Sequence, residues 1–122
     1  MKKITYSILF VLTSIVMSSA VFAGEVGGIK NYTDTVEGNE SVSYNLILKA
    51  NELLTIKLSA NADSNIDCYL HDWKTGNTLA SDTSPSSSCF LSYTPKNQGK
   101  YILNIVNTGD KSNTYQFVTD NK

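Results

Sequence analysis

The sequence predicts an all-β fold, an antiparallel β-sandwich or jelly roll of seven to eight short strands with one disulfide. From residue 41 onward, apolar residues recur at every second position, as in strands with one buried face, and no helical stripe competes with them. Residues that favour turns, such as Asn, Asp, Gly, Pro and Ser, separate these segments. Two cysteines fall on the apolar faces of their segments.

The first predicted strands cover 41–48 and 54–60, with a turn at 50–52 between them. In both segments apolar residues alternate with small polar or charged ones, which is typical of half-buried strands. A polar loop at 61–65 precedes a strand over 66–72. The side chains expected to face the core are Val42, Tyr44, Leu46, Leu48, Leu54, Ile56, Leu58, Ala60, Ile66, Cys68 and Leu70.

The second half of the chain continues this pattern. Turn residues occupy 74–77, and residues 107–110 predict a hairpin loop before a closing strand. The segment between Tyr101 and Val106 is apolar enough to be a central strand. The strands expected here are a short one near Leu79 and longer ones over 89–93, 101–106 and 115–119.

Residues 1–23 match a secretory signal. Lys2 and Lys3 give it a positive start, an apolar stretch follows, and small residues lead to Ala23. Since the apolar stretch is too short for a transmembrane helix, we expect cleavage after Ala23, export to the periplasm or the extracellular space, and no membrane insertion afterwards. Residues 24–122 are then enough for a single β-sandwich domain.

The composition disfavours nucleic acid as a partner. The chain contains no arginine, and its formal net charge of −1 becomes −3 once Lys2 and Lys3 are removed. Contacts to phosphates and bases depend on clustered lysine and arginine. The other lysines are scattered, which also argues against a patch that binds acidic membranes.

Cys68 and Cys89 are predicted to form a disulfide, because both lie in the part of the chain expected to be exported. Closing a loop of about 22 residues would stabilise the fold by roughly 3 kcal/mol. The rival interpretations are a zinc site and a catalytic thiol. Zinc would need two further soft ligands where only His71 exists, and a nucleophilic thiol would need a histidine base.

A set of strand and turn segments occurs in the order of a known family. They are Tyr44–Ala50, Leu54–Leu58, Asn65–Leu70, Gly76–Ser81 and Gly99–Asn107, followed by Gly109 and Tyr115. Together they resemble the bacterial pre-peptidase C-terminal domain, a β-sandwich appended to secreted peptidases and related to collagen-binding modules. The chain departs from that family in having no catalytic domain and in its cysteine pair. The resemblance implies a non-catalytic module that binds a surface, a polymer or another protein, sometimes with calcium.

Catalysis is disfavoured by the placement of the residue types it needs. The serines 86–88, His71 and Asp72 supply the side chains of a serine hydrolase, but His71 and Asp72 are adjacent on a strand and so point to opposite faces. The sequence contains no G-x-S-x-G motif, and its acids show no spacing that suggests a glycosidase. A small hydrolase is therefore the weakest hypothesis.

Tyr69, His71 and Trp73 alternate along one predicted strand and should share the face opposite Cys68 and Leu70. An exposed aromatic row would suit a sugar ring or a partner protein. The alternative, which we favour from the sequence, is that Trp73 is buried and plugs the end of the sandwich, as is usual for a single tryptophan in a small domain.

Calcium is the metal for which the sequence offers ligands, because oxygen donors cluster at Asp34, Glu37, Asn39 and Glu40. These residues match no fixed calcium-binding signature, and solvated acids are common in turns. We therefore expect no cofactor.

The sequence predicts an exported, non-catalytic binding module with a protein or polysaccharide ligand. The alternative is a periplasmic inhibitor or immunity-type protein that caps a partner enzyme, through either the loop 81–88 or the hairpin 107–113.

Overall fold

The computed structural model describes residues 26–61 and 63–122, so the signal predicted at 1–23 lies outside the described residues. The described part consists of strands and connections and contains no helix long and apolar enough to cross a membrane. The strands are β1 (Gly28–Val36), β2 (Ser41–Leu48), β3 (Leu54–Ala60), β4 (Ile66–Asp72), β5 (Thr78–Asp82), β6 (Ser88–Tyr93), β7 (Gly99–Asn107) and β8 (Asn113–Asn121).

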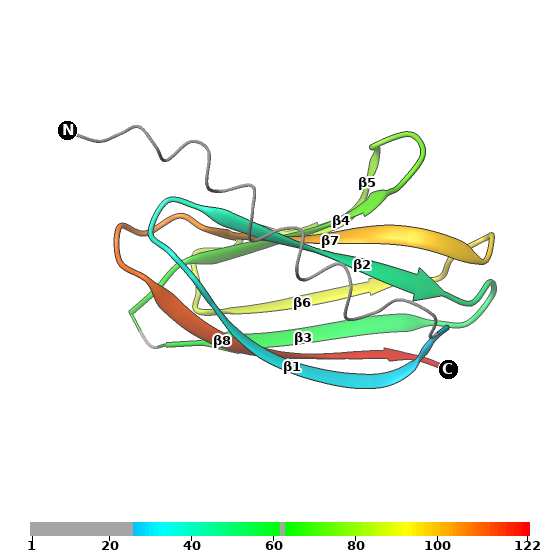
Figure 1. The fold of residues 1–122 in the computed structure, drawn as a ribbon, viewed down its shortest axis with the longest axis horizontal. Coiled ribbons are helices and arrows are strands. Elements are labelled where there is room, and N and C mark those ends of the chain that lie inside the picture. The colour runs from blue at the N-terminus through cyan, green and yellow to red at the C-terminus, as the bar shows by residue number, and fades with distance from the viewer. Residues whose placement is uncertain (1–25, 62) are drawn as a thin grey trace.

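The strands form two four-stranded antiparallel sheets that pack face to face (Figure 1). The first sheet has the order β1-β8-β3-β6 and the second the order β2-β7-β4-β5. β4 and β5 pair directly, whereas every other connection between the described strands crosses from one sheet to the other. This arrangement is a jelly roll, and it confirms the fold class predicted from the alternation.

The two layers meet in the core that the alternation predicts. Val42, Tyr44, Leu46 and Leu48 of β2 are all buried, and their neighbours along the strand are half-buried. β3 and β4 follow the same pattern, and β7 lies between β2 and β4 as the predicted central strand. Removing each large aliphatic side chain from water stabilises the fold by about 1.5–3 kcal/mol.

Two sequence expectations are corrected by the sheet order. Residues 107–110 do not form a hairpin, because β7 lies in the second sheet and β8 in the first, so this connection is an arch between sheets. The sequence shows turn chemistry there, but turn residues do not reveal whether the next strand pairs with the last one. β1 was not located from the sequence, because most of its residues are exposed and alternation is weak.

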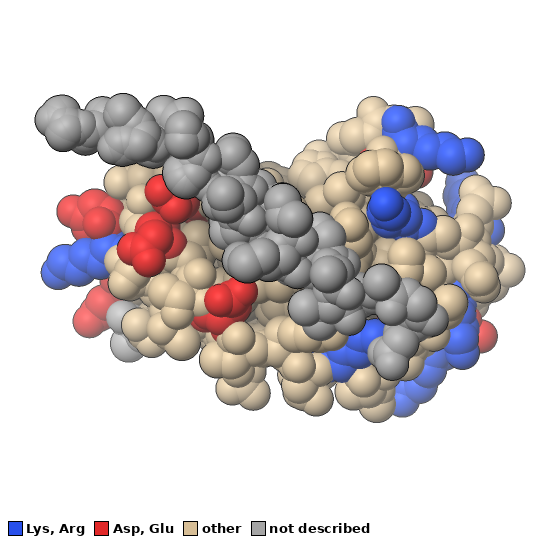
Figure 2. All heavy atoms as spheres, viewed as in Figure 1, with Lys and Arg blue, Asp and Glu red and all other residues tan. Residues whose placement is uncertain are grey.

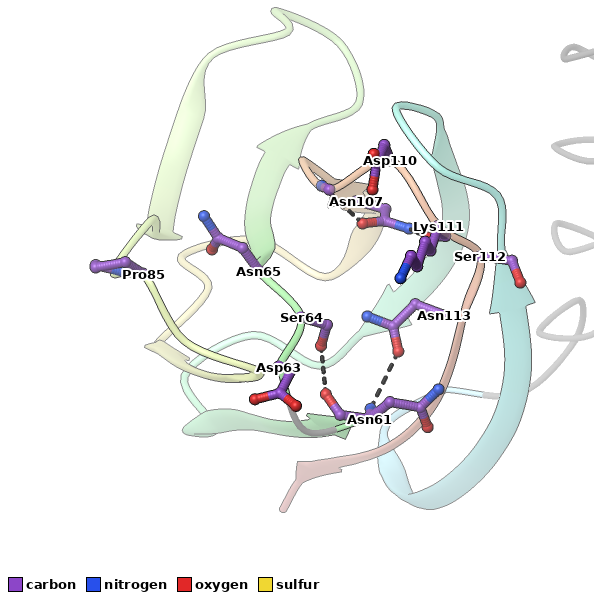
Figure 3. Close-up of a pocket in the computed structure, with 11 residues that line it drawn as sticks. Asn61, Asp63, Ser64, Asn65, Pro85, Asn107, Asp110, Lys111, Ser112 and Asn113 are labelled. Carbon is purple, nitrogen blue, oxygen red and sulfur yellow. Dashed lines mark hydrogen bonds between the residues drawn. The ribbon is translucent and has the colours of Figure 1, made fainter.

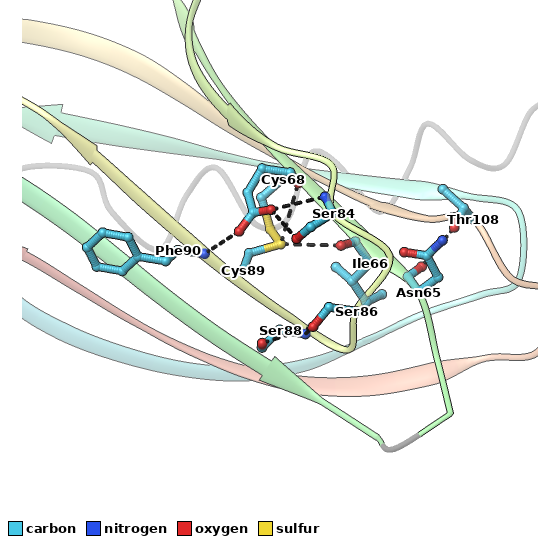
Figure 4. The surroundings of a disulfide bond; sticks show 10 residues. Asn65, Ile66, Cys68, Ser84, Ser86, Ser88, Cys89, Phe90 and Thr108 are labelled. Carbon is cyan, nitrogen blue, oxygen red and sulfur yellow. Dashed lines mark hydrogen bonds between the residues drawn. A yellow bond between two sulfur atoms is a disulfide. The ribbon is translucent and has the colours of Figure 1, made fainter.

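The disulfide joins the two sheets at the edge formed by β5 and β6 (Figure 4). Cys68 of β4 and Cys89 of β6 are buried, and their Cα atoms lie 6.3 Å apart, within the usual range for a disulfide. The predicted pairing is confirmed. Because β5 is short and β6 is an edge strand, this bond stabilises the side of the sandwich with the least sheet pairing.

Candidate binding sites

The connections gather at two opposite ends of the sandwich (Figure 1). One end, which we call the loop end, carries the β1–β2, β3–β4, β5–β6 and β7–β8 connections. Figure 2 shows mainly acidic side chains at the loop end, with one lysine among them, and mainly lysines at the other end. Glu37, Asp63 and Asp110 lie in connections of the loop end, whereas Lys49 and Lys96 lie in connections of the opposite end. The molecule therefore has a charge difference along its long axis.

Backbone hydrogen bonds tie the connections of the loop end to one another. Thr108 N–H donates to the Asn65 carbonyl at 3.0 Å, which links the β7–β8 arch to the β3–β4 loop. Ile66 N–H donates to the Ser86 carbonyl at 3.1 Å, which brings in the β5–β6 loop. Asn39 N–H donates to the Gly109 carbonyl at 2.8 Å and adds the β1–β2 turn. The loops of this end are thus held in fixed positions relative to one another.

Asn107 strengthens this arrangement from within. Its side-chain nitrogen donates to the carbonyls of Val36, Glu37 and Lys111 at 3.3, 3.3 and 2.7 Å. Its side-chain oxygen accepts from Gly109 N–H at 3.0 Å. The side chain is 1% exposed, so these bonds replace all of its contact with water.

Gly38 allows the β1–β2 turn to approach the arch closely. A Cβ at this position would lie 2.3 Å from the carbonyl carbon of Asp110, so a side chain does not fit there without movement of the backbone.

A polar pocket of about 520 Å³ opens at the loop end (Figure 3). Its walls come from the β3–β4 loop and the β7–β8 arch, and Pro85 of the β5–β6 loop adds to the rim. The lining side chains are mainly amides, hydroxyls and carboxylates, with the Lys111 ammonium among them. The volume falls within the range of roughly 300–1,000 Å³ of small-ligand pockets.

Two buried amide atoms in the pocket lining have no hydrogen-bond partner among the described residues. They are the side-chain oxygen of Asn65 and the side-chain nitrogen of Asn113. The Asn113 oxygen accepts from Asn61 N–H at 3.0 Å, and a backbone N–H can only donate, so the unpaired atom must be the nitrogen. Figure 3 shows this nitrogen turned away from Asn61 toward the middle of the pocket.

The aromatic row lies on the outer face of the second sheet, away from the pocket. The Tyr69 and His71 rings stack with centroids 6.0 Å apart and an interplanar angle of 8°. His71 Nδ1 hydrogen-bonds the Thr78 hydroxyl of β5 at 3.1 Å, which fixes the ring on the sheet. Tyr69 and His71 therefore stack on this face, and a ligand-binding role of Tyr69, His71 and Trp73 stays a prediction.

Trp73 is 52% exposed, so the expectation that it plugs the end of the sandwich is wrong. It follows the last residue of β4 and projects beyond the sheet, and the Lys100 ammonium lies 3.9 Å from the centroid of its ring. Trp73 escapes burial because the core between the sheets is already filled by smaller inward side chains such as Leu70.

The serine, histidine and aspartate considered for a serine hydrolase each form hydrogen bonds to other groups. The Asp72 carboxylate accepts from Lys74 and Thr75 N–H at 2.7 and 3.0 Å and so shapes the β4–β5 turn. The Ser86 hydroxyl bonds that of Ser88 at 3.2 Å in the β5–β6 loop. His71 bonds a threonine rather than either of them. No hydrogen bond found within 26–61 and 63–122 joins two members of the triad.

Among the oxygen donors proposed for calcium, the Asp34 carboxylate has local partners. The Asp34 carboxylate accepts from Thr35 N–H and from the Tyr44 hydroxyl, and Glu37 accepts Glu40 N–H through its backbone carbonyl. In the described part of the chain, no three His, Cys, Asp or Glu side chains are grouped so that they could hold a metal ion. Calcium binding by Asp34, Glu37, Asn39 and Glu40 stays a prediction.

Near the disulfide, the pKa values of two carboxyl groups, those of Asp67 and Asp82, are shifted in opposite directions. Hydrogen bonds from the Ser84 hydroxyl and Phe90 N–H lower the pKa of Asp82, at distances of 2.6 and 2.9 Å (Figure 4). Burial, and then the charge of Asp82, raise the pKa of Asp67. The Asp67 Oδ1 atom is buried without a hydrogen-bond partner among the described residues, so its charge is poorly compensated.

No protein-family model and no curated protein matches the sequence, but solved structures do match the fold. The pre-peptidase C-terminal domain of a Bacillus anthracis collagenase is similar with a TM-score of 0.62 and 17% identity, over 77% of this chain and 94% of that one. The chain has the fold of that domain. The likeness predicted from the strand and turn segments is thus confirmed at the level of fold.

The same fold occurs in PliG, a periplasmic inhibitor of g-type lysozyme. The protein from Aeromonas hydrophila matches with a TM-score of 0.59 and 10% identity, over 79% of this chain and 88% of that one. The one from Salmonella Typhimurium matches with a TM-score of 0.52 and 18% identity, over 79% and 89%. At these identities the likeness concerns the architecture alone.

The pocket was not predicted from the sequence. Its asparagines lie at strand ends, where asparagine is read as turn chemistry, and nothing in the local sequence shows that three loops meet.

Proposed function

We propose that this protein is an exported, non-catalytic binding module that recognises a protein or polymer partner through exposed surface. The observation that carries the proposal is the exposure of Trp73 beside Lys100, just after the strand on which Tyr69 and His71 stack. Aromatic side chains supply much of the binding energy at interfaces, and the cation over the ring holds it in one orientation. The signal-like residues 1–23 and the disulfide support export.

Non-catalytic action is supported by the hydrogen bonds of His71, Asp72 and Ser86, which each side chain makes to a different partner outside the triad. A hydrolase needs its nucleophile, base and orienting acid within hydrogen-bond reach of one another. Here Asp72 shapes a turn and Ser86 bonds a neighbouring serine. The proposed module therefore works by recognition without turnover.

The alternative, a protein that caps a partner enzyme, is favoured by one separate observation. The β5–β6 loop and the β7–β8 arch, the two segments named for this role from the sequence, meet at the loop end and both line its pocket. Their backbone bonds to the β3–β4 loop would keep them in place during docking, which reduces the entropy lost on binding.

The test is affinity purification of the exported protein from its own cell envelope, with matched variants. Phe90 is also 52% exposed but lies on β6 of the other sheet, so Phe90→Ala removes an equally exposed aromatic ring from the opposite face. We expect wild type and Phe90→Ala to enrich the same partner and Trp73→Ala to lose at least about tenfold of it. Enrichment of one protein at a fixed ratio favours the capping alternative, and enrichment of glycan favours a polymer ligand.

A second measurement needs no partner. The chain has a single tryptophan, so its fluorescence reports on Trp73 alone. Acrylamide should quench the native protein strongly, and less so once a partner is bound. A native protein whose emission is shielded from acrylamide, or equal recovery of the partner by Trp73→Ala and Phe90→Ala, would overturn the role given to Trp73.

A further inference from the structure

We propose that the loop-end pocket binds one residue of a neutral, hydroxyl-rich ligand, a sugar. This goes beyond the function proposed for the aromatic row, because the pocket and Trp73 lie in connections at opposite ends of the sandwich. Asn65 and Asn113 supply the unpaired acceptor and donor, and the two sites can be tested separately.

Three buried asparagines at strand ends allow an internal comparison. Asn107 uses both ends of its amide, as described for the arch. Asn121 does the same at the opposite end, where its oxygen accepts from Lys49 N–H at 2.7 Å and its nitrogen donates to the Glu52 carbonyl at 2.9 Å. Asn113 is 2% exposed and uses only its oxygen. Of these three side chains, those of Asn107 and Asn121 thus have partners for both amide atoms, and the one in the pocket lining that lacks a partner for its nitrogen is Asn113.

An unpaired donor and an unpaired acceptor in the lining of one pocket select the chemistry of the ligand. A buried amide atom without a partner destabilises the unoccupied pocket, and a matching group of the ligand would recover that cost. One hydroxyl of a ligand can accept from Asn113 while another donates to Asn65, and sugars carry several hydroxyls. A metal ion would satisfy the Asn65 oxygen but not the Asn113 nitrogen, and it would face the Lys111 ammonium.

The charges of the pocket favour a neutral ligand. Asp63 and Asp110 contribute two carboxylates and Lys111 one ammonium, so neither an anion nor a cation meets a single sign of charge. The carboxylates can accept from further hydroxyls. The Asn113 nitrogen is shielded from solvent, and the exposed Lys111 side chain, which lies beside it in Figure 3, has to move for a ligand oxygen to enter.

The lining also argues against a protein side chain as the occupant. Anchors of protein interfaces are enriched in tryptophan, tyrosine and arginine, which fill apolar pockets on the partner. Here Pro85 is the one residue of the lining with an apolar side chain, and no aromatic ring of the described residues lines the pocket. Hydrogen bonds that replace bonds to water contribute little net energy, so we expect weak binding, with a Kd of about 1 mM.

The test is an NMR titration of the full exported protein labelled with nitrogen-15. The probes are methyl glucoside and N-acetylglucosamine, each also as a short oligosaccharide to separate free sugar from polymer. We expect saturable shifts of the Asn113 side-chain NH₂ signal and of pocket backbone amides. Asn65→Ala should weaken binding about tenfold, because it removes the acceptor while the Asn65 carbonyl keeps its bonds to Thr108.

Two variants serve as controls. Asn65→Asp keeps an acceptor at the same place and should retain binding, and Trp73→Ala changes the other site and should bind sugar normally. Four results would overturn the proposal: no saturable shift with any sugar, shifts that Asn65→Ala leaves unchanged, a bound water as the sole partner of Asn113, or shifts with an arginine-containing peptide instead of sugar. None of these bears on the Trp73 experiment.

Discussion

The Tyr44 hydroxyl of β2 hydrogen-bonds the Tyr115 hydroxyl of β8 inside the core, which joins the two sheets through a polar contact. The Tyr44 hydroxyl also donates to the Asp34 carboxylate of β1 at 3.1 Å. Because a carboxylate only accepts, Tyr115 is the donor to Tyr44. Phe117 packs against both rings, with its centroid 4.9 Å from that of Tyr44 and 6.2 Å from that of Tyr115.

This chain of bonds predicts unequal costs for the two phenylalanine substitutions. Tyr44→Phe removes the shared oxygen and leaves the buried Tyr115 hydroxyl without that partner, so we expect a loss of about 1–3 kcal/mol in the free energy of unfolding. Tyr115→Phe leaves the Tyr44–Asp34 bond intact and should cost about 1 kcal/mol. Urea unfolding at neutral pH measures both, and a larger loss in Tyr115→Phe would contradict the assigned direction.

The same pair predicts how stability changes at alkaline pH. Burial raises the pKa of both Tyr44 and Tyr115 well above the ordinary value for tyrosine. Their contribution to stability is complete below the unfolded-state pKa of about 10 and is lost as the pH rises above it, because only the unfolded chain can ionise these phenols easily. The free energy of unfolding should fall above about pH 10, and the fall should be smaller when both residues are phenylalanine.

The disulfide should account for a large part of the stability. The double variant Cys68→Ala, Cys89→Ala removes a cross-link that closes a chain separation of 21 residues, so we expect a loss of about 3 kcal/mol. Urea unfolding of the oxidised protein, the reduced protein and the double variant checks this. The last two should agree, and an unchanged unfolding midpoint in the double variant would contradict the prediction.

Asp67 and Asp82 should respond to pH in opposite ways. The raised pKa of Asp67 means that its ionised form destabilises the folded state, so Asp67→Asn should stabilise the protein at neutral pH and lose this advantage once the native carboxyl is protonated. The lowered pKa of Asp82 means that its charge is stabilising above about pH 4.

Asp82→Asn is therefore the matched control for Asp67→Asn. It should destabilise at neutral pH, and the difference should vanish as the pH falls below the lowered pKa of Asp82. Thermal unfolding of both variants between acidic and neutral pH measures these effects. Destabilisation by Asp67→Asn at neutral pH would show that its carboxylate has a partner in solution.

Local sequence patterns were enough to predict the strands of the core, because each inward side chain follows from the two-residue repeat of a strand. In the segments 42–48 and 54–58, every second side chain is buried, at the positions that the alternation predicts. The disulfide was also predictable, since Cys68 and Cys89 each fall on an inward position. β1 escaped prediction because it is an edge strand whose residues are mostly exposed.

The candidate sites depended on contacts between distant segments. The sequence placed Tyr69, His71 and Trp73 on one face but could not decide the exposure of Trp73, which depends on what else fills the end of the core. The pocket needs Asn65 and Asn113 in one lining, although they are far apart in the chain. This placement follows from connections that cross between sheets.

The amino-acid sequence by itself determined the strand type, the inward faces and the cysteine pair, because these follow from a repeat that each strand carries alone. The tertiary structure decided the order of strands within the sheets, the exposure of Trp73 and the placement of Asn65 and Asn113 in one pocket. Turn residues indicate that the chain reverses direction. Which strand pairs with which depends on how the two sheets together cover one core.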